Sequence, residues 1–279
     1  MKKLAVALVA FLAAYVHAGD ITLPRPVTNG GIPLMQALSQ RRSARDFDNG
    51  RELGLQTLSS LLWAANGFNR AEDSRRTAPT GRNVQDTDVY VILPDGIYFY
   101  DAKDNKLVSV NPGDHRHIAG LQEFARRAPV NLVYVHDRKR AMKSSQADIM
   151  RYAGIHTGAI MQNVYLFCAK EGLVTVARAM LDYDAVAKAL KLDDSKRVIL
   201  AQSVGYPASK APVTRQEAIN AALERAGLSQ NNVHDLECSK DTENGIPVWE
   251  VEFDHGGYNY EYDIDIRTGA ILKSKKERD

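Results

Sequence analysis

The chain has 279 residues, a formal net charge of +2 at pH 7 and a charged fraction of 25%. A charge so evenly balanced argues against a nucleic-acid-binding protein, which needs a strongly basic surface. The two cysteines, Cys168 and Cys238, are too few for a disulfide framework, and no Cys or His residues are paired at zinc spacing, so we expect separate thiols and no metal.

The first residues, MKKLAVALVAFLAAYVHAGD, have the pattern of a Sec-type signal peptide. Lys2 and Lys3 form a positive region, an apolar run follows to Tyr15, and residues 16–18 form a small-residue cleavage site. The run is short for a membrane span, which needs ~20 residues. We therefore expect residues 1–18 to be removed, leaving a periplasmic or otherwise exported protein without a membrane span. An uncleaved anchor is the alternative.

Residues 19–209 mix helices and strands without a regular βαβ repeat, which favours the α+β class. Apolar residues at helical spacing predict helices within 31–40 and 55–67 and a long helix over 147–171, which ends at Gly172. Short apolar or alternating runs predict strands at 87–93, 96–101, 106–110, 130–136, 173–179 and 197–207, with a helix at 183–192.

A linker around residues 208–213 predicts a domain boundary. Residues 210–279, which follow it, have a different pattern of predicted helix and strands. Thr214 and Glu217 predict a capping box for a helix over 215–227, and four alternating segments then predict an antiparallel sheet. One face of this sheet carries the acidic residues Glu250, Glu252, Glu261, Asp263 and Asp265. We interpret it as a solvated outer face, with a site for a cation or a basic partner as the alternative.

The segment RRSARDF, residues 41–47, directly follows the first predicted helix. Three guanidinium groups within five residues repel one another unless an anion lies between them. Arg41, Arg42 and Arg45 match phosphate bidentately, and the hydroxyl of Ser43 can complete such a cage. The alternative is a solvated basic face at a helix C-terminus.

Three further stretches accompany this segment. RTAPTGRNVQDTDVYVIL places a loop directly before a strand, GIHTGAIMQNVYLFCAKEGLVTVARAM joins a long helix to a strand through a glycine turn, and QSVGYPASKAP ends a strand. In this order and spacing, with RRSARDF, they resemble the nitroreductase-like family of FMN-dependent oxidoreductases over most of residues 30–210.

The resemblance implies a nitroreductase-like fold, with a central mixed, largely antiparallel sheet flanked by helices, and a homodimer with FMN at the subunit boundary. It assigns the FMN phosphate and ribityl chain to the segment at 41–45, the isoalloxazine edge to the loop before the strand, and the N5 region to backbone amides after a later strand. The cofactor-binding residues implied are Arg41, Arg42, Ser43, Arg45, Pro79, Thr80, Gly81, Asn83, Ala179, Met180 and Lys210.

Within the family, GIYFYDAKDNKLVSV is similar to the branch that includes the SagB-type azoline dehydrogenases. That branch carries a catalytic Lys-Tyr pair ahead of the long helix. Lys143 corresponds to the lysine, whereas Ser144 stands in place of the tyrosine. We expect Lys143 and Tyr152 to form the proton relay on the substrate side, and we interpret His156 as a core histidine rather than a proton donor.

The C-terminal segment resembles a PepSY domain, in which one helix packs on an antiparallel sheet; VWEVEF and YEYDIDIRTGAIL carry the likeness. Such a domain implies binding or regulation outside the cytoplasm. Together the resemblances predict an exported oxidoreductase that transfers hydride between the N5 atom of FMN and a small-molecule or peptide substrate. Two alternatives stay open: a non-catalytic envelope protein that acts through its PepSY domain, and a peptide azoline dehydrogenase.

Overall fold

The computed structural model describes residues 19–208 and 212–278. The predicted signal peptide at 1–18 and Lys210 therefore lie outside the described residues. The chain divides into two compact units between residues 208 and 209. Among the residues described, no helix combines the length and the apolar character that crossing a membrane requires.

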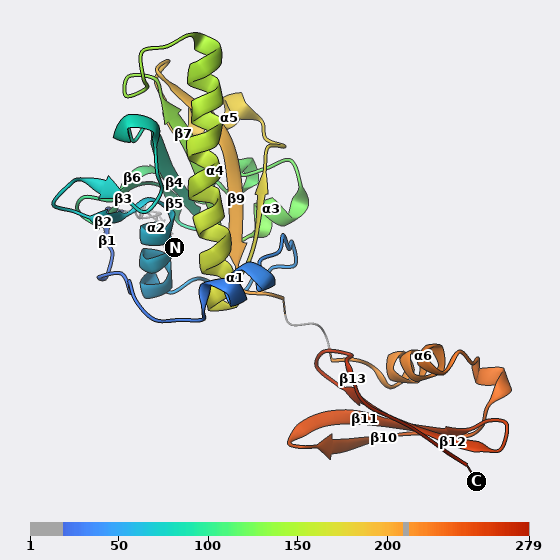
Figure 1. Cartoon of the computed structure of the whole chain (residues 1–279). Helices are drawn as coiled ribbons and strands as arrows, with labels where there is room; N and C mark the ends of the chain where they lie inside the picture. Colours follow the sequence, from blue (N-terminus) through green and yellow to red (C-terminus); the bar gives the residue numbers. More distant parts are fainter. Residues whose placement is uncertain (1–18, 209–211, 279) are drawn as a thin grey trace, which may run out of the picture. The chain divides into compact units, whose positions relative to one another are not determined.

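The elements of the first unit alternate irregularly between helix and strand (Figure 1). In chain order they are β1 (Ile21–Thr22), α1 (Leu34–Gln40), α2 (Leu55–Asn66), β2 (Phe68–Arg70), β3 (Arg75–Arg76), η1 (Gly81–Asn83), β4 (Thr87–Leu93), β5 (Gly96–Asp101), β6 (Lys106–Pro112), η2 (Arg116–Ile118), α3 (Glu123–Arg127), β7 (Val130–Asp137), α4 (Gln146–Glu171), β8 (Val174–Arg178), α5 (Tyr183–Ala189) and β9 (Lys196–Gly205).

Seven of these strands form one sheet in the order β1-β6-β5-β4-β7-β9-β8. Every pairing between neighbours in this sheet is antiparallel. The predicted α+β class is confirmed, but the described sheet is antiparallel throughout and not mixed. β8 is the last strand of the sheet, and the segment after α1 lies along its outer edge, where the Ala44 N–H donates to the Thr175 carbonyl.

Each face of the sheet is covered by its own hydrophobic core, as alternating side chains of β4 show. Val89 and Val91 pack in the core that α2 and α4 cover, whereas Tyr90 and Ile92 pack in the core on the α5 side. The apolar side chains of α4 belong to the first of these cores. Ile160, Val164 and Phe167, which form an apolar stripe on this helix, are therefore part of the core of one chain.

The long helix α4 has a defined start and end. The Ser145 side chain caps it by accepting a hydrogen bond from the Asp148 N–H. At its other end Gly172 has a φ of 66°, a left-handed conformation that glycine adopts without steric cost. The chain then turns directly into β8, so the last turns of α4 lie beside the edge strand.

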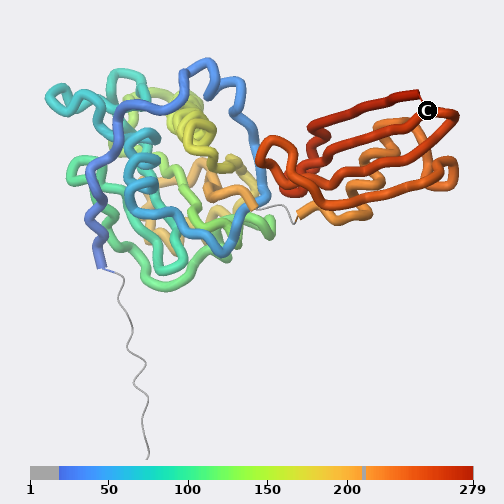
Figure 2. The backbone as a smooth tube through the Cα atoms, turned by 90° about the horizontal axis from the view of Figure 1, so that it is seen from below, coloured from blue at the N-terminus to red at the C-terminus, as the bar shows by residue number. Residues whose placement is uncertain are grey.

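The second unit contains α6 (Arg215–Ala226), η3 (Gln230–Asn232) and a four-stranded antiparallel sheet in the order β10-β11-β12-β13. The strands are β10 (His234–Glu243), β11 (Ile246–Asp254), β12 (Tyr258–Asp265) and β13 (Ile271–Arg278), and they follow one another as a meander (Figure 2). The capping box of Thr214 and Glu217 is present. One helix therefore packs on an antiparallel sheet, as predicted.

The acidic face of this second sheet is less solvated than we expected. Asp263 and Asp265 are buried, and Glu250, Glu261 and Asp263 place carboxylate oxygens within 4.8 Å of one another. Burial and the neighbouring acids raise the pKa of Glu250. Lys273 contacts Glu261 and compensates part of this charge.

Candidate active site

The segment at 41–47 leaves α1 in an extended conformation and runs along the edge strand β8. The Ala44 N–H donates to the carbonyl of Thr175 over 3.0 Å, and Phe47 forms an isolated bridge with Pro207. Side chains of extended backbone alternate between two sides. The segment therefore distributes its polar side chains around the sheet edge.

Tyr165 of α4 joins this segment to β8. Its hydroxyl lies 2.9 Å from the hydroxyl of Ser43 and accepts a hydrogen bond of 2.9 Å from the Ala177 N–H. The guanidinium carbon of Arg41 lies 5.4 Å from the centre of the Tyr165 ring, within the range of a cation–π contact. Sequence reasoning did not single out Tyr165; its place in QNVYLFCAKEGL was the only signal.

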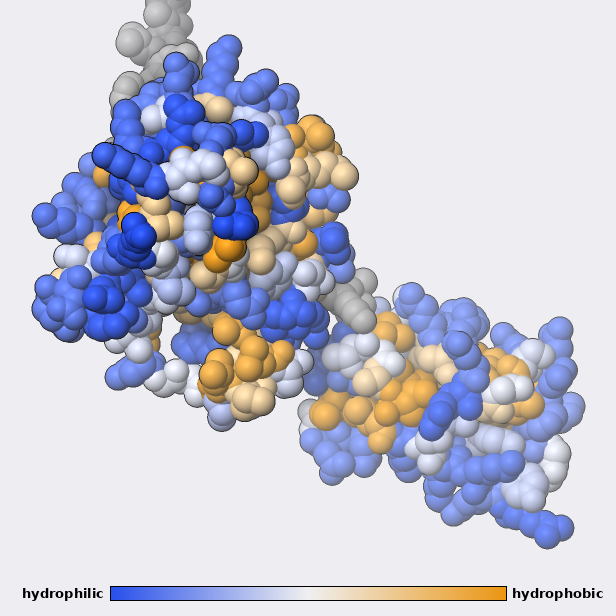
Figure 3. All heavy atoms as spheres, turned by 45° about the horizontal axis from the view of Figure 1, so that its top comes forward, coloured by the Kyte–Doolittle hydropathy of each residue, from blue (hydrophilic) through white to orange (hydrophobic). Residues whose placement is uncertain are grey.

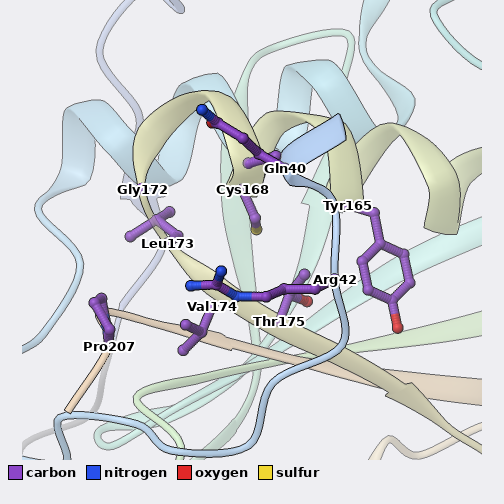
Figure 4. Close-up of a pocket in the computed structure, with 10 residues that line it drawn as sticks. Gln40, Arg42, Tyr165, Cys168, Gly172, Leu173, Val174, Thr175 and Pro207 are labelled. Carbon is purple, nitrogen blue, oxygen red and sulfur yellow. The ribbon is translucent and has the colours of Figure 1, made fainter. Parts of the chain in front are cut away.

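A cavity of about 280 Å³ opens beside this junction, and the Arg42 side chain extends into it (Figure 4). The carboxyl end of α4 forms one wall, where the helix dipole favours a cation. Pockets that hold an entire small ligand usually measure ~300–1,000 Å³, so this cavity fits only part of one. Its lining residues are Gln40, Arg42, Tyr165, Cys168, Ala169, Gly172, Leu173, Val174, Thr175 and Pro207.

Arg45 lies apart from the other two arginines. Its guanidinium carbon is 5.8 Å from the centre of the Phe124 ring, and Phe124 packs with Val176 on the face of the sheet that α4 does not cover. Within residues 19–208 and 212–278, none of the three arginines forms an ion pair with a carboxylate. The structure thus places Arg41 and Ser43 at Tyr165 and Arg42 in the adjacent cavity, and among the described residues neither arginine has a carboxylate partner.

The predicted loop at 79–83 lies at the other end of α4. The Gly81 N–H donates to Nε2 of His156 over 2.9 Å, and the Tyr152 ring lies 5.9 Å from the His156 ring. Lys143 is exposed and directly follows Met142, which packs against Gly81. The predicted site therefore has a second group of residues near the amino end of α4: Pro79, Thr80, Gly81, Asn83, Lys143 and Tyr152.

The helix α4 separates these two groups within one chain. His156 and Tyr165 are nine residues apart, which corresponds to about 13 Å along the axis and about half a turn around it. The loop precedes β4 and the arginine segment borders β8, three strands away in the sheet, or about 14 Å. One ligand that touches both groups of the same chain would have to pass around the helix.

Ala179 and Met180 follow β8 and are exposed. Their carbonyls are used within the fold, because the Tyr183 hydroxyl donates to Ala179 and the Leu121 N–H donates to Met180. Their own N–H groups have no acceptor among the described residues. Two backbone donors are therefore available to a ligand at the end of the edge strand.

Replacing Tyr165 with phenylalanine should lower the free energy of unfolding by about 1–3 kcal/mol, because the Ala177 N–H loses its acceptor in a partly buried place. Chemical denaturation of the two proteins measures this difference. Tyr183→Phe is the matched control, since the Tyr183 hydroxyl bonds an exposed carbonyl. Equal stability of wild type and Tyr165→Phe would show that the Tyr165 hydroxyl does not tie the helix to the strand.

Each of the two units resembles a known protein family. Residues 38–206 match the profile of the nitroreductase family, and residues 212–275 match that of the PepSY family, described as peptidase propeptide and YPEB domain. A crystal structure from Ralstonia eutropha JMP134, described as a nitroreductase, is 38% identical, with 68% of this chain and 90% of that chain covered and a TM-score of 0.65.

Two more distant relatives extend the comparison. A Methanocaldococcus jannaschii protein named as a nitroreductase is 27% identical over 66% of this chain and 92% of its own length. The Escherichia coli microcin synthetase McbBCD complex with truncated pro-MccB17 is 20% identical, with a TM-score of 0.52 over 73% of this chain and 84% of that chain. At that identity the likeness concerns the fold alone. The predicted nitroreductase-like fold and the PepSY unit are confirmed.

Proposed function

Because the chain belongs to the nitroreductase family, whose members are typically FMN-dependent oxidoreductases, we propose that it binds FMN and transfers hydride between the flavin and a small-molecule or peptide substrate. One observation supports the proposal: Arg41 and Ser43 both contact Tyr165, Arg42 of the same segment extends into the adjacent cavity, and neither arginine has a carboxylate partner among the described residues. Arginine forks and a hydroxyl are the donor set that a phosphate group requires.

The same residues distinguish FMN from a dinucleotide. They are three consecutive residues in one segment, and the sequence has no Gly-x-Gly-x-x-Gly fingerprint for a pyrophosphate. When bound, the flavin supplies the hydride chemistry at its N5 atom. The chain's own residues bind and orient it: Arg41, Arg42 and Ser43 at the phosphate, and the free N–H groups of Ala179 and Met180 at the ring.

A homodimer completes the site in this proposal. Each flavin takes its phosphate donors from one copy and the loop at 79–83 from the other, because α4 separates the two groups within one chain. Apolar side chains gather at the surface of the first unit (Figure 3). Leu34, Met35 and Leu38 of α1, directly before the arginines, are 64%, 74% and 43% exposed. Such an apolar helix face is typical of a subunit contact.

We propose Lys143 and Tyr152 as the proton relay. In the dimer, the copy that provides the loop at 79–83 also provides these two residues. Tyr152 is half-buried beside His156, and Lys143 is exposed. The narrower activity, azoline dehydrogenation, requires a tyrosine after the lysine. Ser144 stands there and its hydroxyl donates to the Asp148 carboxylate at the start of α4, so we propose a different substrate.

The absorbance spectrum of the purified mature protein tests the proposed cofactor. After reconstitution we expect the absorbance bands of flavin at close to one FMN per chain. Denaturation should release FMN and not FAD. A protein that takes up no flavin would overturn the proposal and leave the alternative, a non-catalytic envelope protein. A bound flavin that no donor reduces would favour the same alternative.

We also propose that the protein is exported. PepSY domains are found in secreted and envelope proteins, and residues 212–275 match that family. The signal-peptide pattern lies at residues 1–18. NAD(P)H is a cytoplasmic donor, so an exported enzyme would draw electrons from another reduced molecule. Fractionation of cells that express the full chain tests this: the protein should appear outside the cytoplasm, shortened by the predicted peptide.

Truncation after Pro212, which keeps Lys210, should leave FMN affinity within a few-fold of the full chain. The second unit has its own capped helix, sheet and core, in which Val213 already takes part. Titration of both proteins with FMN measures the effect, with a melting curve as the control for folding. A folded truncation that no longer retains FMN would show that residues of the second unit belong to the site.

A further inference from the structure

Three polar side chains are buried together where the sheet meets α4. Asp86, just before β4, is 1% exposed, His136 of β7 is 1% exposed and His156 of α4 is 2% exposed. Burying ionisable groups costs free energy unless each finds partners. The proposed chemistry uses none of these three residues.

The hydrogen bonds of His156 fix its protonation. The Gly81 N–H donates to Nε2, so Nε2 carries no proton. The proton lies on Nδ1, which is 2.8 Å from a carboxylate oxygen of Asp86 and donates to it. Asp86 thus holds the one neutral tautomer of His156 that can accept from the loop.

The loop held by this histidine is strained. Arg82, Asn83 and Gln85 have φ angles of 53°, 55° and 50°, a left-handed region that residues other than glycine adopt at a cost. Strained backbone persists only where surrounding contacts enforce it, and it gathers at functional sites. Here the bond to His156 fixes one end of the strained stretch, and Arg140, which donates to the Gln85 carbonyl over 2.6 Å, fixes the other.

We propose that Asp86 and His156 form a buried clamp that holds the loop at 79–85 in the conformation that presents Asn83 to the flavin. Both are positioning residues, because they act through the loop and do not touch the cofactor themselves. The inference rests on the proposed function for the role of Asn83. The clamp itself rests on the two hydrogen bonds and the backbone angles.

His136 provides a matched control. It is as deeply buried, and its Nδ1 lies 3.5 Å from the other carboxylate oxygen of Asp86, but neither ring nitrogen has a hydrogen-bond partner. His136 therefore shares the cluster and the carboxylate with His156, yet makes no bond to the loop. A change at His136 disturbs the core without releasing the clamp.

Amide hydrogen exchange of the full chain without added FMN tests the clamp directly. His156→Phe keeps a planar ring and removes the acceptor, so exchange of residues 80–85 should become about tenfold faster or more, while His136→Phe should leave these amides within about twofold of the wild type. His156→Gln, whose carbonyl can accept from Gly81, should restore part of the protection. Unchanged exchange in folded His156→Phe would overturn the clamp.

Flavin binding then tests the consequence of the clamp for the cofactor. In Asp86→Asn the tautomer of His156 is no longer fixed, because an amide can donate to Nδ1 as well as accept from it. We expect the bound-flavin spectrum and the flavin reduction potential to shift in His156→Phe and, less strongly, in Asp86→Asn, but not in His136→Phe. Faster loop exchange with an unchanged spectrum and potential would overturn the role toward Asn83. A wild type that binds no flavin but shows the predicted exchange pattern would refute the proposed function and leave the clamp standing.

Discussion

Replacing Arg41 and Arg42 together with alanine should weaken FMN binding by about 150-fold or more. Each guanidinium supplies charge-assisted hydrogen bonds worth about 1.5–3 kcal/mol, and about 3 kcal/mol in total corresponds to a little over two orders of magnitude in the dissociation constant. The two residues lie beside Ser43 and Tyr165 and have no carboxylate partner among the described residues, so their removal leaves no internal charge unpaired. Fluorescence titration of the flavin-free protein with FMN measures the change.

Arg45→Ala is the control for this prediction. It removes a positive charge from the same heptapeptide, but its side chain lies over Phe124 on the other face of the sheet. Its effect should stay within about tenfold, the magnitude of one surface charge contact. If Arg45→Ala costs more than the double variant, the phosphate lies on the Phe124 side, and the cluster at Tyr165 is a structural contact.

Hydrophobic periodicity predicted most elements of the first unit, because their apolar side chains face the hydrophobic cores on the two sides of the sheet. The strand at 87–93 was predicted with the bounds of β4, since apolar side chains fill both faces of this central strand. The end of α4 at Gly172 followed from the left-handed turn that glycine permits. β1 and β3 were missed because strands of two residues carry no period, and α3 was missed because five residues span little more than one helical turn.

The site was predictable only where its residues lie close together in the sequence. The arginine segment is local, and its charge pattern was visible. Tyr165 was missed because its partner Ser43 lies 122 positions away, and no local pattern indicates that contact. The bond between Gly81 and His156 spans 75 positions, so the sequence indicated a core histidine without its role in holding the loop.

Because α4 separates the two groups within one chain, we expect two defective variants to complement each other in a mixed dimer. Two variants that each fail to hold FMN should restore it when they share a dimer. Arg41→Ala with Arg42→Ala removes the phosphate donors, and Asn83→Asp removes the amide donor of the loop while keeping a residue that tolerates its φ of 55°. Asn83 is exposed, so its replacement leaves the core of each chain intact.

In a mixed dimer of these variants, one flavin site combines both defects and the other has neither, if the sites are shared between copies. Random mixing gives about half mixed dimers, so about a quarter of all sites should regain wild-type affinity. Two affinity tags, one on each variant, isolate the mixed dimer and raise that share to about half, which FMN titration separates clearly from the parent variants. If each chain builds its own site, every site in the mixture keeps one defect and no tight binding returns. Recovery would therefore place the arginines and Asn83 of different copies on one flavin, and its absence would show that no flavin is shared in this way between two copies.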